Sequence, residues 1–154
     1  MKNILIIGGH DPTSGAGITA DIRVLAQKNI YVTSVISCLT VQNSFGVTSI
    51  EQVSDRVFTQ QIKSILVDFQ PHYVKLGLVA SLEQLQIIQE LLSSYKIVFD
   101  PVLFPSLGNF SKPLFEQTDF HRVIKEFLQS CFLITPNETE FRYLFDVPER
   151  EILT

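Results

Sequence analysis

The segment most able to hold a ligand runs from residue 8 to residue 21 and reads GGHDPTSGAGITAD. It follows an apolar run at residues 4–7 and leads into a helical pattern in which Ile18, Ile22 and Leu25 share one face. Glycine is used where the backbone must approach a ligand or adopt a positive φ. A strand, a glycine-rich turn and a helix N-terminus together predict a site for an anion or a small polar ligand.

Two common phosphate-binding loops do not fit this segment. A P-loop ends in Gly-Lys-Ser/Thr, and no lysine lies between Lys2 and Lys28. A dinucleotide-binding fingerprint would need a tighter turn after its strand and an acid closing the next strand, which here ends in the acid-free residues 37–40. A glycine-rich turn that binds nothing is the simplest remaining alternative.

Two polar side chains near this segment could read the edge of a small ring. Asp21 lies near the start of the predicted helix 18–29, where it could accept a hydrogen bond from an amine or hydroxyl. The alternative is an ordinary first-turn acid favoured by the helix dipole. Gln42 follows the predicted strand 31–39, and its amide could pair with a ring nitrogen beside an amino group. The alternative is an amide that satisfies its own loop.

The elements that position these residues alternate between strand and helix. Strands are predicted at residues 4–7, 31–39, 73–79, 96–100 and 131–135, with a polar loop at 42–46 and an extended segment at 47–53. Helices are predicted at 18–29, from a cap at residue 54 or 55 to before Pro71, and from a capping box at Ser81 and Gln84. Two further helices are predicted, one from a cap at Asp119 to about residue 129 and one after Pro136. This order predicts an α/β fold with a mainly parallel sheet. Ligands of such sheets bind at the carboxyl ends of the strands.

Composition narrows the class of protein further. The 154 residues suggest one domain, 1–154, and a net charge of −4 without a basic run argues against a nucleic-acid partner. The apolar runs are too short to span a membrane, and the N-terminus lacks the architecture of a signal peptide. Cys38 and Cys131 lie in apolar runs, which favours free thiols in a reducing cytoplasm over a disulfide.

The glycine-rich segment resembles the N-terminal signature of the hydroxymethylpyrimidine and hydroxymethylpyrimidine-phosphate kinases of thiamine biosynthesis. That signature reads A-G-x-D-x-S-G-G-A-G-I-x-A-D. The chain matches it at the following positions: Gly9, Asp11, Gly15, Ala16, Gly17, Ile18, Ala20 and Asp21. It departs at Thr13-Ser14, where the family has Ser-Gly. The resemblance implies a ribokinase-like, three-layer α/β/α fold and the ATP- and Mg²⁺-dependent phosphorylation of 4-amino-5-hydroxymethyl-2-methylpyrimidine and its monophosphate.

Further motifs extend the resemblance along the chain and imply roles for single residues. The motifs are Gln42-Asn43, Lys75-Leu76-Gly77-Leu78 for the family's K-I-G-M, Asp100-Pro101-Val102, and Thr135-Pro136-Asn137 followed by Glu140. The resemblance implies that the pyrimidine is held by Gly9, Ala16, Asp21, Gln42, Leu78 and Val102. It implies a magnesium-linked role for Asp100, Asn137 and Glu140. An Asn137 helix cap with Glu140 at its third residue is the alternative for that pair.

The resemblance also has limits. The family is longer at the C-terminus, where a G-T-G-C segment supplies its anion hole and catalytic residue, so we expect no catalytic residue within this chain and a C-terminally incomplete domain. Residues 107–109 depart from the family's K-S-G-D. A pyridoxal kinase-like enzyme, a non-catalytic pyrimidine-binding module and, more distantly, a flavodoxin-like protein are the alternatives. The related kinases are dimers, which leaves a homodimer open.

Overall fold

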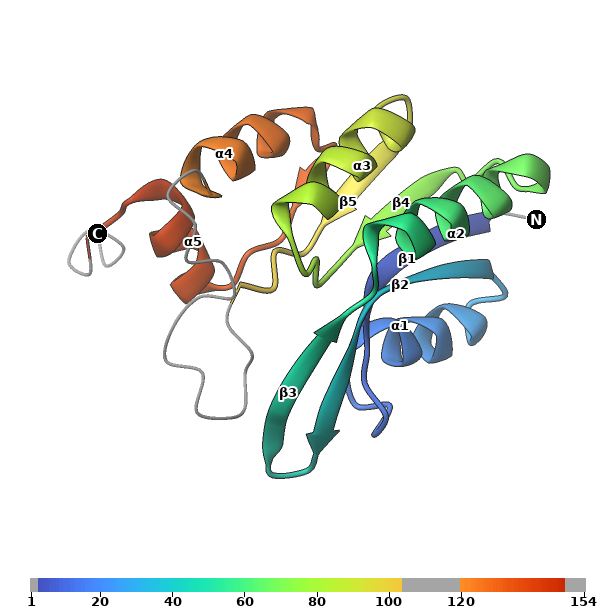
Figure 1. The fold of residues 1–154 in the computed structure, drawn as a ribbon, viewed down its shortest axis with the longest axis horizontal. Helices are drawn as coiled ribbons and strands as arrows, with labels where there is room; N and C mark the ends of the chain where they lie inside the picture. Colours follow the sequence, from blue (N-terminus) through green and yellow to red (C-terminus); the bar gives the residue numbers. More distant parts are fainter. Residues whose placement is uncertain (1–2, 104–119, 149–154) are drawn as a thin grey trace.

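The computed structural model describes residues 3–103 and 120–148, which form a six-stranded sheet and five helices (Figure 1). The strands are β1 (Asn3–His10), β2 (Tyr31–Asn43), β3 (Gly46–Gln52), β4 (Tyr73–Leu76), β5 (Lys96–Phe99) and β6 (Leu133–Ile134). The helices are α1 (Gly17–Ala26), α2 (Asp55–Asp68), α3 (Leu82–Leu92), α4 (Phe120–Ser130) and α5 (Glu138–Phe145). The strand order is β3-β2-β1-β4-β5-β6.

The sheet is parallel except at one edge. β1 pairs in parallel with β2 and β4, β4 with β5, and β5 with β6, whereas β3 is antiparallel to β2. The carboxyl ends of the parallel strands therefore meet at one edge of the sheet. The prediction of an α/β fold with a mainly parallel sheet is confirmed.

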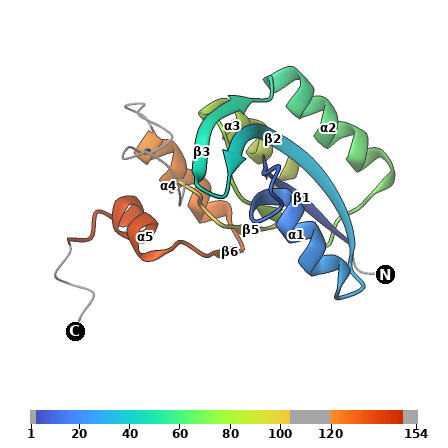
Figure 2. The same cartoon turned by 90° about the horizontal axis from the view of Figure 1, so that it is seen from below.

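Helices lie on both faces of the sheet (Figure 2). Alternate strand residues point to opposite faces, and Leu5 and Ile7 join the main core cluster with Phe58 of α2 and Ile88 of α3. α1 packs on β1 and β2 from the other face, with its buried residue Ile18 close to Gly8. The three-layer arrangement predicted from the resemblance is thereby present in the described residues.

The predicted loop at 42–46 is wrong. Gln42 and Asn43 belong to β2, which turns through Ser44 and Phe45 into β3 and pairs with it from Cys38 to Asn43. β1 ends opposite Leu39, so the rest of the hairpin extends beyond the sheet as a two-stranded ribbon (Figure 1). Because solvent reaches both faces of such a ribbon, its polar residues resemble a loop in the sequence.

Other element boundaries differ from the predictions by a few residues. β1 runs on to His10, whereas the strand predicted at 131–135 contracts to Leu133–Ile134. α1 ends at Ala26, three residues earlier than predicted. The predicted Asp119 cap and residues 107–109 lie outside the described residues. None of the helices in the described ranges is long and apolar enough to cross a membrane.

A buried glutamine joins the hairpin base to α3. Gln84 is fully buried, and its side-chain amide donates to the carbonyls of Ser37 (3.0 Å) and Val53 (3.1 Å). The oxygen of the same amide accepts from Ala80 N (3.0 Å), while Gln84 N donates to Ser81 Oγ (3.2 Å). The predicted capping box is therefore half formed, because the Gln84 side chain bonds residue 80 rather than the N-cap.

We expect Gln84→Leu to lower the free energy of unfolding by about 3 kcal/mol, because it removes the side-chain donor of the Val53 carbonyl and the acceptor of Ala80 N, and leaves the Ser37 carbonyl with only its bond from Val53 N. Urea denaturation followed by circular dichroism measures this loss. Gln86→Leu, on the exposed side of the same helix, is the matched control. If Gln84→Leu were as stable as that control, the hydrogen bonds of Gln84 would not contribute to stability as proposed.

Candidate functional site

A cavity of about 510 Å³ opens at the carboxyl ends of β1 and β4. Its wall combines the loop after β1, the start of α1, the hairpin β2–β3, the end of β4 and the segment after β5. The predicted site residues that line it are Gly9, Ala16, Asp21, Gln42, Leu78, Asp100 and Val102. The structure thus brings seven of the nine residues to one cavity, while their roles stay predictions.

The loop after β1 is built around the carboxylate of Asp11. This residue is only 3% exposed, and its oxygens accept from the backbone N–H groups of Thr13 (2.8 Å), Ala16 (2.9 Å) and Gly15 (3.1 Å). Thr13 Oγ1 adds a further hydrogen bond at 2.9 Å. Burial acts to raise the pKa of Asp11, but these hydrogen bonds outweigh it and hold the pKa below its usual value.

This carboxylate changes how the loop can be used. The sequence predicts that the glycine-rich turn offers backbone N–H groups to an anion or a polar ligand. In the structure, three of those groups already donate to Asp11. The loop therefore shapes the cavity wall, and these three N–H groups are not available to a ligand.

Two glycines allow the loop to lie close to β1. Gly17 has φ +59°, and a Cβ at that position would lie 2.3 Å from the carbonyl oxygen of Gly9. At Gly9, a Cβ would lie 2.9 Å from Leu78 Cδ2 and 3.1 Å from Cys38 Sγ. Neither position has room for a side chain without displacing the backbone of the loop or the floor of the cavity.

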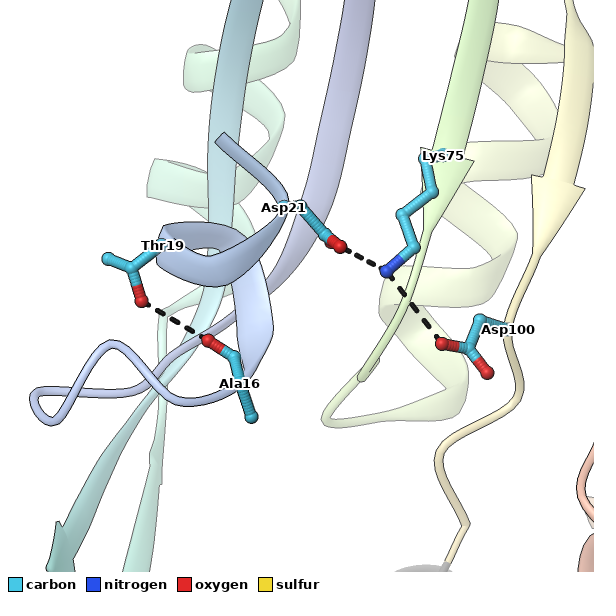
Figure 3. Close-up of polar contacts among 5 residues, drawn as sticks. All are labelled: Ala16, Thr19, Asp21, Lys75 and Asp100. Carbon is cyan, nitrogen blue, oxygen red and sulfur yellow. Dashed lines mark hydrogen bonds and ion pairs between the residues drawn. The ribbon is translucent and has the colours of Figure 1, made fainter. Parts of the chain in front are cut away.

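A lysine joins two carboxylates inside the cavity (Figure 3). Lys75 Nζ lies 2.5 Å from Asp21 Oδ2 and 3.7 Å from Asp100 Oδ2. Asp21 comes from α1, Lys75 from β4 and Asp100 from the residue after β5. The side chains are 27%, 28% and 41% exposed, respectively, so solvent and ligand can reach all three.

The rest of the wall is largely apolar. Leu78 and Val102 line it near the strand ends, and Val47 and Ile50 line it from β3. Gln42 Oε1 accepts from Thr40 Oγ1 at 3.3 Å. Lys75, Val47 and Ile50 also line the cavity, and none of them was predicted as a site residue from the sequence. Recognition of a hairpin after β2 would have indicated Val47 and Ile50. Lys75 was noted only as part of the motif Lys75-Leu76-Gly77-Leu78, with no role of its own.

Asn137 and Glu140 are not among the residues that line the cavity. They form a reciprocal cap on α5: Glu140 N donates to Asn137 Oδ1 (2.9 Å), and Asn137 N donates to Glu140 Oε2 (2.9 Å). Glu140 Oε1 accepts from Leu103 N at 3.3 Å. Burial, with a contribution from the charge of Asp100, raises the pKa of Glu140 despite these hydrogen bonds.

The donor set of this region gives limited support to a magnesium site. Asn137 Oδ1 and both Glu140 oxygens are engaged with backbone N–H groups, so they do not fit direct ligation. Asp100 keeps a carboxylate at the cavity, and Mg²⁺ is usually held by one or two carboxylates together with waters and substrate phosphates. Within the described residues, no group of three His, Cys, Asp or Glu side chains could hold a metal ion.

Both cysteines are free thiols with raised pKa values. Burial raises the pKa of Cys38 to about 11 and that of Cys131 to about 12. The thiols therefore stay protonated at neutral pH, where a nucleophilic or metal-binding cysteine would need to be a thiolate. The prediction of unpaired thiols agrees with this structure.

The fold is that of the ribokinase-like class, and comparison with known proteins identifies the family within that class. The family model described as phosphomethylpyrimidine kinase matches residues 11–152. The chain belongs to this family.

Two curated relatives illustrate the match. The hydroxymethylpyrimidine/phosphomethylpyrimidine kinase of Escherichia coli K12 is 32% identical over 158 residues, which cover 98% of this chain and 58% of that protein. The enzyme of the same name from Aquifex aeolicus is 36% identical over 152 residues, covering 97% of this chain and 55% of that protein. The chain thus spans about half the length of these relatives.

Solved structures agree with the sequence comparisons. Phosphomethylpyrimidine kinase from Clostridium difficile 630 superposes with a TM-score of 0.80 at 29% identity, over 96% of this chain and 65% of that one. An ADP complex of Bacillus subtilis pyridoxal kinase superposes with a TM-score of 0.79 at 21% identity, over 97% and 55% of the two chains. The second likeness shows a shared fold alone.

The departure at Ser14 has a cost in stability. Ser14 has φ 59°, a conformation that disfavours residues with a Cβ, at the position where the family signature has glycine. We expect Ser14→Gly to raise the free energy of unfolding by about 0.5–1 kcal/mol. Asn29→Gly is the matched control, since Asn29 has φ 54° but asparagine tolerates this region. Chemical denaturation of both variants measures the difference, and an equal or smaller gain at Ser14 would contradict the expectation.

The Asp11 carboxylate also predicts a pH dependence of stability. Because its folded pKa is lowered, it contributes stability that is complete above its unfolded value, 3.8, and is lost as the pH falls through the folded pKa. We expect Asp11→Asn to cost about 2 kcal/mol at pH 7 and progressively less below about pH 4. Urea denaturation from pH 2.5 to 7 tests this, with the exposed Glu51→Gln as control. A cost that does not change with pH would show that the ionised carboxylate is not what holds the loop.

Proposed function

We propose that this chain carries the pyrimidine site of a hydroxymethylpyrimidine/phosphomethylpyrimidine kinase. The enzyme would transfer the γ-phosphoryl group of ATP to 4-amino-5-hydroxymethyl-2-methylpyrimidine and then to its monophosphate, in thiamine biosynthesis. The observation that carries the proposal is the convergence of Asp21, Gln42, Leu78 and Val102 on one cavity from four separate segments of the chain. Family membership supports the same reading.

The chemistry of these side chains suits an aminopyrimidine. Asp21 can accept a hydrogen bond from the exocyclic amine, and the Gln42 amide can both donate to and accept from the ring edge. Leu78 and Val102 provide apolar contact for the ring, within a wall that otherwise carries few charges. Gly9 and Ala16 give the ligand close access to the loop backbone, because they add little or no side chain there.

Phosphoryl transfer needs groups that position and neutralise the phosphates. We assign Asp100 to the region where Mg²⁺ would meet the substrate, directly or through water, since it is the predicted metal ligand whose carboxylate lines the cavity. Mg²⁺ that enters with ATP would offset the negative charge of the phosphates. Asn137 and Glu140 hold the neighbouring backbone through the α5 cap. A cytoplasmic location, supported by the two free thiols, is part of the same proposal.

Two alternatives lead to different ligands. A pyridoxal kinase-like enzyme shares the fold, as the Bacillus subtilis structure illustrates, but that likeness lies at 21% identity. The glycine-rich signature and the 32–36% identity to the pyrimidine kinases favour the pyrimidine. A pyrimidine-binding module without kinase activity is the second alternative. It would respond to the pyrimidine but not to MgATP.

We expect the chain to bind the hydroxymethylpyrimidine, and Asp21→Asn to weaken binding about 10- to 100-fold, the usual range for losing a hydrogen bond to a charged group. Isothermal titration calorimetry measures the affinity, with the exposed Asp68→Asn as control. Titrations with pyridoxal and with MgATP, and an assay of ADP release, separate the alternatives. Tighter binding of pyridoxal than of the pyrimidine would overturn the proposed substrate.

A further inference from the structure

The cavity contains one cation whose role the proposed function does not explain. Among the described residues that line the cavity, Lys75 is the sole Lys, Arg or His. Its ammonium group donates to Asp21 Oδ2 at 2.5 Å and lies 3.7 Å from Asp100 Oδ2 (Figure 3). The contact therefore involves the very carboxylate that we assign to the pyrimidine amine.

The position of Lys75 in the sheet places its side chain toward Asp21. β4 is paired on both sides, with Lys75 opposite Ile6 of β1 and opposite Val98 of β5. Its backbone is thus fixed by two neighbouring strands, and a Cβ at Gly77 would lie 3.8 Å from Nζ. The ammonium group therefore lies beside the cavity, with the Lys75 side chain 28% exposed.

The contact divides the two oxygens of Asp21 between different partners. Oδ2 is engaged by Lys75, whereas no hydrogen bond to Oδ1 occurs within the described part of the chain. Both oxygens of an ionised carboxylate are acceptors, and this contact sets the direction in which Oδ1 faces. Gln42 cannot give the same discrimination, because a side-chain amide presents a donor or an acceptor according to which way it is turned.

We infer that Lys75 is a positioning residue that determines specificity: by holding Asp21 Oδ2 it fixes the direction in which the acceptor Oδ1 faces, so that the site selects a ring with an amino group over one with a carbonyl group at the same position. This inference rests on the proposed function, since it concerns the same pyrimidine site. An amino group donates to Oδ1, whereas a carbonyl oxygen would face it with another acceptor.

A purely structural role does not account for this ion pair. Pairs exposed to this extent contribute little to stability, typically below about 1 kcal/mol. Asp21 and Asp100 would instead become two neighbouring carboxylates without a cation between them if Lys75 were removed. Asp21 would then be free to turn away from Asp100 and to meet a ring N–H beside a carbonyl group.

The test compares two ligands that differ at one ring position. The probes are 4-amino-5-hydroxymethyl-2-methylpyrimidine and its analogue with a carbonyl group in place of the amine. Calorimetry gives the ratio of the two affinities for the wild-type chain, Lys75→Met and Lys75→Gln, each also in an Asp21→Asn background. Lys96→Met is the matched control, because Lys96 lies on the neighbouring strand β5 and does not line the cavity.

We expect the preference for the amino ring to fall at least about tenfold in both Lys75 variants and to stay unchanged in Lys96→Met. In the Asp21→Asn background, loss of Lys75 should change the ratio by less than about twofold, because its effect acts through Asp21. A thermal melt of each variant separates a local change from unfolding, and Lys75→Gln replaces Lys75→Met if the latter does not fold.

Two results overturn the inference and differ from failure of the proposed function. A wild-type ratio in folded Lys75→Met or Lys75→Gln excludes a role in selectivity, while pyrimidine binding itself would still stand. An equal fall in the ratio with and without Asp21 would show that Lys75 does not act through that carboxylate. If the wild-type chain binds neither ring, the proposed function fails, and this inference fails with it.

Discussion

The hydrogen bonds that collect on the Asp11 carboxylate are the interaction on which the site depends. A buried charge is tolerated only when it is well hydrogen-bonded, and Asp11 meets this condition through the backbone of the loop that follows it. The loop is thereby folded back on β1, which brings Gly17 against the Gly9 carbonyl. α1 begins at Gly17, and this places Asp21, one helical turn further along, at the cavity.

This arrangement also determines which groups recognise the ligand. Because the N–H groups of Thr13, Gly15 and Ala16 are occupied by Asp11, polar recognition depends more on side chains from elements that are distant in the sequence. The result is a cavity with few charged groups, in which one ammonium group lies between two carboxylates. Such a site suits a small ring that presents hydrogen-bond donors better than it suits a free anion.

Much of the fold and part of the site could be predicted from the sequence for physical reasons. Apolar runs such as residues 4–7 indicate buried parallel strands, and parallel strands bring their polar ends to one edge. The β2–β3 hairpin was missed because Ser44-Phe45 lacks the Asn-Gly or Asp-Gly signal of a two-residue turn. The contact between Lys75 and Asp21 joins residues 54 positions apart and depends on the register of β4, which no local pattern reveals.

The N-x-x-E spacing at Asn137 and Glu140 is compatible with two different roles. The sequence allowed either a helix cap or a magnesium-linked role, and the structure contains the cap in both directions. Yet Glu140 also reaches Leu103 N, next to the Val102 wall and close enough to Asp100 for that charge to raise its pKa. The cap therefore connects the N-terminus of α5 to the segment that carries Asp100. Because this connection consists of hydrogen bonds within the chain, the motif can hold the cavity wall in place without itself ligating an ion.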